Sequence, residues 1–343
     1  MAGRPTIIDV AKEAGVSAAT VDRVLNGRQN VRTDTAKLVY EAASRIGYHA
    51  SRLIEQRLSE TLPRFRFGFL LTKPNQAFYQ SMARHLEQAV NAAPGIRGEA
   101  LVAFCPTQTH RDIVQMMRDI GAKVDALAAV AVNHQYTTAA VTDLKAAGVP
   151  TISLLSDYAQ GERAAYIGLN NLKMGRVAAS MLATAIHAPG KVAVFVGGHR
   201  WHGHELRETG FRSYFREHHP LFTVLDTLVN LETRQLTHEA TLDLLERHPD
   251  LSGMYVAGGG MEGAIAALRE VREPGQVALV VNELTPESRA ALSDRYALMA
   301  ISTPLEEFSR DLVSLMIRAA RGAQTALPVQ RFLEPQLHLP ESI

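Results

Sequence analysis

The hydrophobic positions of the chain follow two periodicities, one near the N-terminus and another after residue 64. Between residues 6 and 47, apolar residues recur at helical spacing in three short segments that end in Gly or Asn-Gly. From residue 65 onward, short continuous apolar runs alternate with longer amphipathic segments. Such runs are typical of strands buried on both faces, and their alternation with helices predicts parallel sheets. We therefore expect a small helical region followed by an α/β core.

The first helical segment carries clear signals at both of its ends. Thr6 is a suitable helix cap, and Asp9, three residues later, completes a capping box. Ile8 and Ala11 recur at helical spacing and are expected to face inward. Gly15 predicts the end of this helix, because glycine enters the left-handed region of backbone conformation at little cost.

A second helical segment follows after a tight turn. Ser17 is a suitable cap, Val21 and Val24 form an apolar face, and the pattern stops at Asn26. A third segment runs from residue 33 to residue 46, with Leu38 among its expected inward positions. Two short helices joined in this way predict a helix-turn-helix, whose second helix lies in the major groove of DNA.

The pattern AxxAGVSxxTVxRVLNG over residues 11–27 closely resembles the N-terminal motif of the lactose-repressor (LacI/GalR) family of transcription regulators, and the similarity continues to residue 48. The resemblance implies a DNA-binding headpiece over residues 1–48, a hinge over 49–63 and an effector-binding core over 64–343. It also implies contacts with double-stranded DNA by Thr6, Ser17, Ala18, Ala19, Thr20, Arg23, Asn26, Arg32, Tyr48, Arg57 and Leu58.

The outer face of the second helix is expected to read the bases. Ala18 and Ala19 offer only methyl contacts, so Arg23 should carry most of the direct hydrogen bonding. Asp22 stands where the family commonly has serine. A carboxylate near phosphates is repelled, so the alternative for Asp22 is to accept a hydrogen bond from a base amino group.

The hinge departs from the pattern of the resembled family, in which a leucine enters the minor groove and kinks the DNA. Arg57 stands at the usual position of that leucine, and Leu58 is next to it. Ala50 replaces the usual proline. Two interpretations stay open: the register slips by one residue and Leu58 is the wedge, or Arg57 enters the groove as a cation.

The core pattern falls into two sets of alternating strands and helices. The predicted strands are residues 65–71, 100–105, 126–132 and 151–155, and then 191–197, 223–229, 253–257 and 277–281. Two such sets resemble the two lobes of the type I periplasmic sugar-binding fold. That resemblance implies three crossings of the chain, near 160–166, 295–303 and 325–330. The first lobe would then take residues 64–162 and 300–326, and the second would take 163–298 and 327–343.

Ligands of open parallel sheets bind beyond the carboxyl ends of the strands. Five loops at those ends carry polar residues beside aromatic rings, a combination that suits a sugar or polyol. The resemblance adds Asn171 as the interlobe asparagine, Glu283 at a sugar-binding aspartate position, and Glu205 in place of an arginine. Two cleft carboxylates argue against an acidic effector and favour a polyol or an amino-modified sugar. The candidate effector residues are Asn75, Phe78, Tyr79, Asn133, Asp157, Asn171, His202, Glu205 and Glu283.

Two other constellations suggest different chemistry. Gly258, Gly260 and Gly263 form GxGxxG between an apolar strand and a helix, with Glu283 further on, which is the dinucleotide fingerprint of an oxidoreductase. His199, His202 and His204 share one loop and could hold zinc, although no cysteine is near. A plain sugar-binding protein is the third alternative, and the N-terminal motif argues against it.

Composition limits the class of protein only loosely. The chain has 343 residues, of which 46% are hydrophobic and 21% charged, and its net charge of +1 does not by itself predict a nucleic-acid partner. The single cysteine excludes an intrachain disulfide and fits a reducing compartment. No apolar segment is long enough for a membrane span, and the N-terminus has no apolar signal region. We expect a cytoplasmic homodimer that binds a near-palindromic operator, uses no cofactor or metal, and is not an enzyme.

Overall fold

The computed structural model describes residues 4–26, 31–54, 62–322 and 330–343. Its contacts divide the chain into two compact units, residues 1–65 with 93–99, and residues 66–92 with 100–343. Arg57 and Leu58 lie outside the described residues, so the minor-groove predictions for the hinge stay predictions.

The N-terminal headpiece contains three helices, α1 (Ile7–Ala14), α2 (Ala18–Asn26) and α3 (Thr33–Arg45). The predicted capping box is present: the Thr6 hydroxyl accepts from the Asp9 N–H, and the Asp9 carboxylate accepts from the Thr6 N–H at 2.8 Å. Gly15 ends α1 in the left-handed region, with φ of 65°. The Ser17 hydroxyl accepts from the Thr20 N–H at 3.2 Å and so caps α2. The predicted helix-turn-helix is confirmed.

The buried faces of two headpiece helices differ from the prediction. Ile8 is 71% exposed and Leu38 is 52% exposed, whereas Val10 and Val39 are fully buried in the shared core of the headpiece. A helix turns by about 100° per residue, so a shift of one or two residues moves the apolar stripe to another face. The spacing predicted the helices and the burial of Ala11 correctly, but it wrongly assigned Ile8 and Leu38 to the core.

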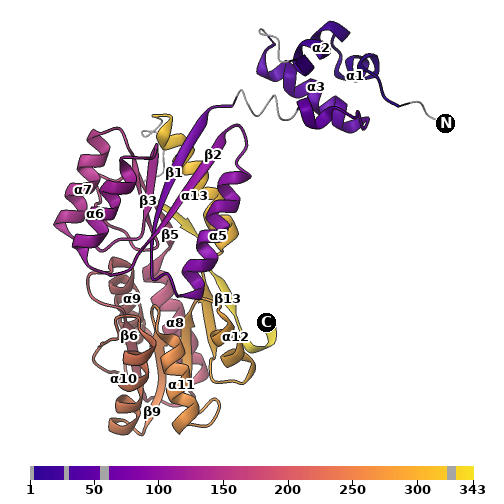
Figure 1. Cartoon of the computed structure of the whole chain (residues 1–343). Coiled ribbons are helices and arrows are strands. Elements are labelled where there is room, and N and C mark those ends of the chain that lie inside the picture. The colour runs from indigo at the N-terminus through magenta and orange to yellow at the C-terminus, as the bar shows by residue number, and fades with distance from the viewer. Residues whose placement is uncertain (1–3, 27–30, 55–61, 323–329) are drawn as a thin grey trace. The chain divides into compact units, whose positions relative to one another are not determined.

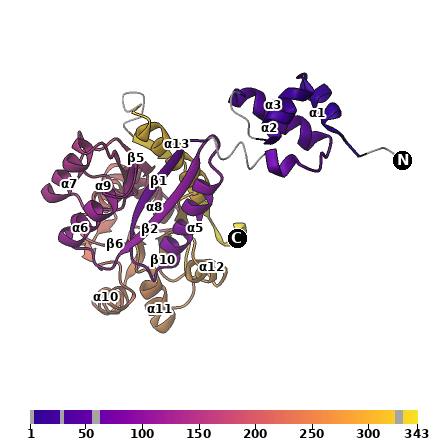
Figure 2. The ribbon, with the colours of Figure 1, turned by 45° about the horizontal axis from the view of Figure 1, so that its top comes forward.

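The first lobe of the core contains a six-stranded sheet in the order β12-β5-β4-β3-β1-β2. Its strands are β1 (Arg64–Thr72), β2 (Arg97–Cys105), β3 (Ala126–Ala129), β4 (Thr151–Leu154), β5 (Ala165–Leu169) and β12 (Gln330–Leu333). The pairings of β1 with β3, β3 with β4, β4 with β5, and β5 with β12 are parallel. Figures 1 and 2 show helices on both sides of the sheet. They are α6 (His110–Gly121) with α7 (Gln135–Ala146), and α5 (Ala77–Asn91) with α13 (Leu305–Ala320).

The second lobe contains a seven-stranded sheet in the order β13-β11-β10-β9-β6-β7, with β8 paired to β6. Its strands are β6 (Lys191–Val196), β7 (Thr223–Val224), β8 (Leu228–Val229), β9 (Leu251–Val256), β10 (Ala278–Asn282), β11 (Met299–Ser302) and β13 (Gln336–His338). β13 pairs antiparallel with β11, and the other pairings are parallel. The helices are α8 (Asn171–Ala185), α9 (His202–His218), α10 (Arg234–Arg247), α11 (Met261–Val271), α12 (Pro286–Ser293) and the short 3₁₀ helix η2 (Pro340–Ser342).

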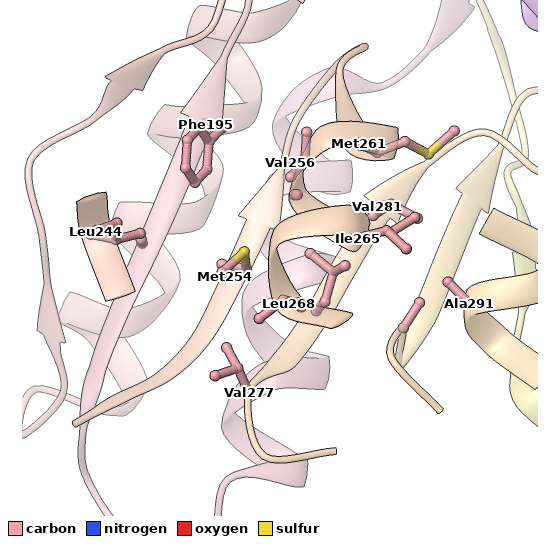
Figure 3. Packing of buried hydrophobic residues seen from close by; sticks show 14 of the residues in the cluster. Phe195, Leu244, Met254, Val256, Met261, Ile265, Leu268, Val277, Val281 and Ala291 are labelled. Atoms are coloured by element: carbon pink, nitrogen blue, oxygen red, sulfur yellow. The ribbon is translucent and has the colours of Figure 1, made fainter. Parts of the chain in front are cut away.

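Apolar side chains fill the space between this second sheet and the helices α10, α11 and α12. Figure 3 shows Phe195, Met254 and Val256 from the strands facing Ile265 and Leu268 of α11, all of them buried. On the other face, α8 and α9 approach each other closely, because a Cβ atom on Gly175 would lie 1.9 Å from the carbonyl oxygen of Arg207. The predicted fold class, a helical headpiece with a two-lobe α/β core of parallel sheets, is confirmed.

The chain crosses between the lobes at residues 169–171, 302–305 and 333–336. The predicted crossings near 160–166 and 325–330 are therefore several residues too early, and the one near 295–303 only overlaps the observed one. The sequence analysis included neither β5 nor α8. β5 pairs with β4, with Ile152 opposite Ala165, so the chain stays in the first lobe until Leu169. Likewise β11 belongs to the second sheet and β12 to the first.

Candidate functional site

A cavity of about 90 Å³ lies between the two lobes, at the carboxyl ends of strands from both sheets. The loops after β1, β3 and β4 form its first-lobe wall, and those after β6, β8, β9 and β10, with the start of α8, form its second-lobe wall. The lining residues are Gln76, Ala77, Phe78, Tyr79, Val130, Leu155, Ser156, Asn171, Trp201, Gly203, His204, Arg207, Glu232, Gly258, Gly259, Met261, Glu262, Asn282, Glu283 and Thr285. The cavity lies where the strand ends led us to expect a ligand.

Some of the predicted effector residues meet at this cavity and others do not. Those that line it are Phe78, Tyr79, Asn171 and Glu283. Asn75 and Asn133 are exposed and are not among the lining residues. His202 also lies outside the lining, with its Nδ1 atom 3.5 Å from a carboxylate oxygen of Glu205.

Glu205 is a correction to the sequence analysis, because its side chain points away from the cavity. It sits in the first turn of α9 and is 62% exposed. Arg207 lines the cavity instead and is buried. Residues two apart on a helix differ in direction by about 200°, so these two positions cannot face the same space. Of the two carboxylates predicted to face the ligand, Glu205 and Glu283, only Glu283 lines the cavity.

Asp157 is a second correction, because its carboxylate is engaged inside the first lobe. It is buried, and Oδ1 accepts from Arg163 Nε at 2.5 Å, while Oδ2 accepts from Arg163 Nη2 at 2.6 Å. The Ser153 hydroxyl donates to the same carboxylate at 2.8 Å. Burial alone would raise the pKa of Asp157, but these bonds and the arginine charge lower it. Asp157 thus stabilises the chain before β5 rather than meeting a ligand.

Glu232 is the cavity carboxylate that the sequence analysis missed. It follows β8 directly, in a loop that was not among the five considered. The predicted strand 223–229 ends just before it, so the same rule about strand ends, applied to this loop, would have found it. Lys73, in the loop after β1 of the first lobe, forms an ion pair with Glu232, and both side chains are nearly buried.

The carboxylate of Glu232 has partners on both of its oxygens. Oε2 accepts from Lys73 Nζ, and Oε1 accepts from the Gly259 N–H at 3.0 Å. His204 Nε2 lies 3.5 Å from Oε1. Burial would raise the pKa of Glu232, but the charge of Lys73 and the neighbouring donors outweigh it and lower the pKa to about 2. Glu232 is therefore an anion that the protein itself neutralises.

His204 is held as a neutral imidazole. The Gly197 N–H donates to Nδ1 at 3.0 Å, so Nδ1 is the acceptor and Nε2 carries the proton that faces Glu232. Burial lowers the pKa of His204 to about 4, and the carboxylate of Glu232 only partly offsets this. The loop thus presents an uncharged ring at neutral pH.

Glu283, the predicted sugar-binding acid, does line the cavity. Its Oε2 accepts from the Thr303 N–H at 3.0 Å, and its Oε1 accepts from the Thr303 hydroxyl at 2.8 Å. Burial raises its pKa, while the two bonds from Thr303 oppose the rise. The positive charge nearest in the lining is Arg207, which donates to Asn171 Oδ1 and to the Ala257 carbonyl, each at 2.7 Å.

Asn282 presents unused hydrogen-bonding capacity to the cavity. Its side chain is 3% exposed, and neither its amide oxygen nor its amide nitrogen has a well-aligned partner among the described residues. Unpaired buried polar groups are costly, and a side-chain amide offers both donors and an acceptor. The aromatic residues Phe78 and Trp201 contribute to the lining from opposite lobes. A polar ligand with some apolar surface would satisfy this environment.

The GxGxxG glycines have structural roles in this fold. The Gly259 N–H, which lies between the first two glycines of the motif, already donates to Glu232. A Cβ atom on Gly258 would meet the side chains of His204 and Glu232 at 2.7–2.8 Å, and one on Gly263 would lie 2.1 Å from the Arg234 carbonyl oxygen. The glycines make room for the cavity side chains and for the contact between α10 and α11. This geometry gives no support to the dinucleotide interpretation.

The three loop histidines do not converge as metal ligands would. His204 turns toward Glu232, and His202 lies near Glu205. In the part of the chain that the structure describes, no group of three or more His, Cys, Asp or Glu side chains is arranged to hold a metal ion.

The headpiece exposes a distinct face of α2. Ala18, Ala19, Arg23 and Asn26 are exposed, while Val21 and Val24 of the same helix are buried. The Asn26 amide donates to the Asp22 carboxylate at 2.8 Å. Thr6, Ser17 and Thr20 form cap bonds at the starts of α1 and α2, and Arg32 is exposed. Tyr48 is the exception among the predicted contacts, because it is 5% exposed and packs in the headpiece core.

Comparisons with known proteins agree with both parts of this architecture. Residues 67–324 match the model of the periplasmic binding protein domain, and residues 6–51 match that of the bacterial regulatory proteins of the lacI family. The HTH-type transcriptional regulator CelR of Thermobifida fusca is 26% identical over 99% of this chain and 98% of its own. Catabolite control protein A of Priestia megaterium is 29% identical, over 43% of this chain and only 42% of its own length.

Two solved solute-binding proteins of ABC transporters share the fold of the core. One, from Agrobacterium vitis with bound α-D-tagatopyranose, has a TM-score of 0.72 and 23% identity, over 81% of this chain and 95% of its own. The other, from Burkholderia graminis in complex with D-arabinose, has a TM-score of 0.74 and 17% identity, over 81% and 96%. Among the described residues, no helix is long and apolar enough to cross a membrane. The chain belongs to the periplasmic binding protein domain family through its core, and it carries at its N-terminus a domain of the bacterial regulatory proteins of the lacI family.

Proposed function

We propose that the chain is a homodimeric repressor whose affinity for a near-palindromic operator is set by a sugar or polyol bound between the two lobes. The observation that carries this proposal is the interlobe cavity, in which, among the described residues, Asn282 has the Tyr255 hydroxyl as a neighbour but no well-aligned hydrogen bond at either amide atom. Ligand hydroxyls would supply the missing donors and acceptors. Phe78 and Trp201 would lie against the apolar faces of a sugar ring.

The fold relatives support the same class of ligand. The two solute-binding proteins compared above carry a bound ketohexose and a bound pentose, respectively. A ligand that binds two states of the core with different affinities shifts operator binding by that difference in free energy. The cavity contacts both lobes, so a ligand there would favour the state in which the lobes are together.

On the DNA side, we propose that the exposed face of α2 reads each half-site. Arg23 is the long donor on that face, and Ala18 and Ala19 leave room for methyl contacts. Because one headpiece reads one half-site, a two-fold dimer reads a near-palindrome. Asp22, which accepts from Asn26, would take a base amino group as a further donor.

Thermal-shift measurements on the full chain test the effector proposal. Neutral polyols, monosaccharides, amino sugars and sugar phosphates are compared at pH 7.5, and the compounds that stabilise the chain are then added to operator-binding assays. We expect a polyol or sugar to stabilise the wild-type chain and to change its operator affinity. Asn282→Leu, which keeps the size of the side chain but removes its hydrogen bonds, should abolish the response.

Glu205→Gln is the matched control, since that side chain points away from the cavity. It should respond to the ligand as the wild type does. Stabilisation by acidic or phosphorylated sugars alone, or a full response in Asn282→Leu, would contradict the proposal.

A further inference from the structure

The ion pair between Lys73 and Glu232 joins the two lobes across the cavity. Lys73 follows β1 of the first lobe, and Glu232 follows β8 of the second. Their side chains are 13% and 10% exposed, so the pair is largely removed from water. Gln76, also from the first lobe, donates to the Glu232 carbonyl oxygen at 3.1 Å. One residue of the second lobe is thus held at its side chain and at its backbone by the first.

The pair also decides the charge that the cavity presents. Glu232 lines the cavity, while Lys73 reaches it from behind the wall and is not itself among the lining residues. On the second-lobe side, the Gly259 N–H donates to Glu232, and the neutral ring of His204 lies 3.5 Å from the same carboxylate. Neither brings a positive charge, so among the residues that the structure describes Lys73 is the cation that balances this carboxylate.

The backbone conformation at Lys73 and at Glu232 indicates that surrounding contacts hold this ion pair in place. Lys73 and Glu232 both have φ of 53°, in the left-handed region that residues other than glycine seldom adopt. Leu231 next to Glu232 also has positive φ, at 48°. Such conformations persist when surrounding contacts over-determine them, and they cluster at clamps and switch regions.

We infer that Lys73 is a built-in counter-ion of the effector cavity, one that holds the lobes together through Glu232 and leaves no unpaired anion for a basic ligand at that position. The inference rests on the proposed function, because it takes the cavity as the effector site. A buried carboxylate without a partner demands a cation. In the wild-type chain Lys73 supplies this cation, so a ligand ammonium group would find no unpaired carboxylate at Glu232. Without Lys73, the same wall would select for a basic group.

The test uses the full chain without effector, so its result does not depend on whether a sugar binds. Trp201 is the only tryptophan, is 6% exposed, and its Nε1 donates to Gln108 of the other lobe at 3.4 Å. Acrylamide quenching of its fluorescence therefore reports separation of the lobes. Lys73→Ala should raise the quenching constant roughly twofold or more, because removing one partner of a buried pair shifts such an equilibrium by about tenfold or more.

Chemical rescue then tests the counter-ion role directly. Propylammonium chloride should restore the low quenching of Lys73→Ala, whereas 1-propanol and sodium chloride at matched concentrations should not. Propylammonium should not change the quenching of the double variant Lys73→Ala/Glu232→Gln, since this variant has no carboxylate charge at position 232. Equal rescue by 1-propanol, or wild-type quenching in Lys73→Ala, would overturn the inference.

Glu232→Gln keeps the proposal testable if Lys73→Ala does not fold. It preserves the size of the side chain and its acceptor oxygen but removes the charge. We expect increased quenching in this variant too, and quenching at the wild-type level would count against the bridge. A failure of every sugar and polyol in the thermal-shift screen would refute the proposed function but would leave these ligand-free outcomes unchanged.

Discussion

Lowering the pH from 7.5 to 5.0 should destabilise the core through His204 in particular. The pKa of this buried ring is about 4 in the folded chain, against an ordinary value of 6.5, so the unfolded chain binds the proton more tightly. Stability is then lost as the pH falls from 6.5 toward 4. The linkage relation gives a loss of about 2 kcal/mol at pH 5.0 from the pKa difference at His204.

Glu232 contributes little to the loss of stability between pH 7.5 and 5.0. Its folded pKa is about 2 and its ordinary value is 4.5, so its contribution to stability is present above pH 4.5 and is lost only below it. At pH 5.0 its expected loss is a few tenths of a kcal/mol, about a tenth of that from His204. The interval between pH 7.5 and 5.0 therefore isolates the histidine from its carboxylate partner.

Urea unfolding followed by Trp201 fluorescence measures this loss. His204→Gln keeps an amide donor and an acceptor at the position but cannot titrate. The pH-dependent loss in the wild type should exceed that in His204→Gln by about 2 kcal/mol. His202→Gln, in the same first turn of α9 but outside the cavity lining, is the control and should behave as the wild type does. Equal losses in the wild type and His204→Gln would refute the assignment of a buried neutral ring.

Three further substitutions test other parts of the structure. Arg23→Ala should weaken operator binding by about 1–3 kcal/mol in fluorescence anisotropy, and an unchanged affinity would remove Arg23 from the base contacts. Asp157→Asn should cost about 3–5 kcal/mol of stability in thermal or urea unfolding, because it removes the charge of the carboxylate to which two nitrogens of the buried Arg163 donate; a loss below 1 kcal/mol would contradict this. Gly175→Ala places a methyl group 1.9 Å from the Arg207 carbonyl and should cost about 1–3 kcal/mol, so wild-type stability would refute the close approach of α8 and α9.

The fold was predictable where the apolar signal is dense. Segments such as β3 and β6 are buried over nearly their whole length and appear in the sequence as uninterrupted apolar runs. α8 was missed because its buried face uses small residues, including Gly175, Ala178 and Ala179, which carry little hydrophobic signal. The crossings between the lobes depend on which sheet a short strand joins, and strand pairing is a non-local choice that local pattern does not contain.

The candidate site was predictable in position but only partly in composition. The rule of strand carboxyl ends correctly indicated Phe78, Tyr79 and Glu283 as residues of the cavity lining, and the family resemblance correctly indicated Asn171. The prediction that Glu205 contacts the effector was wrong, because matching a residue to a family position does not show which way its side chain faces on a helix. The bridge from Lys73 to Glu232 could not be predicted, since it joins loops 159 residues apart in the chain. Long-range ion pairs of this kind become visible only once both lobes are built.

The three crossings between the lobes limit which parts of the protein can be exchanged by recombination. The last two strands of the chain, β12 and β13, belong to different sheets. Residues 330–338 therefore contribute to both lobes. Neither lobe corresponds to a continuous segment that a recombination event could copy, delete or replace. Exchange of a single lobe would therefore need several coordinated crossovers, whereas the helix-turn-helix occupies one uninterrupted stretch near the start of the chain and can be exchanged as a block.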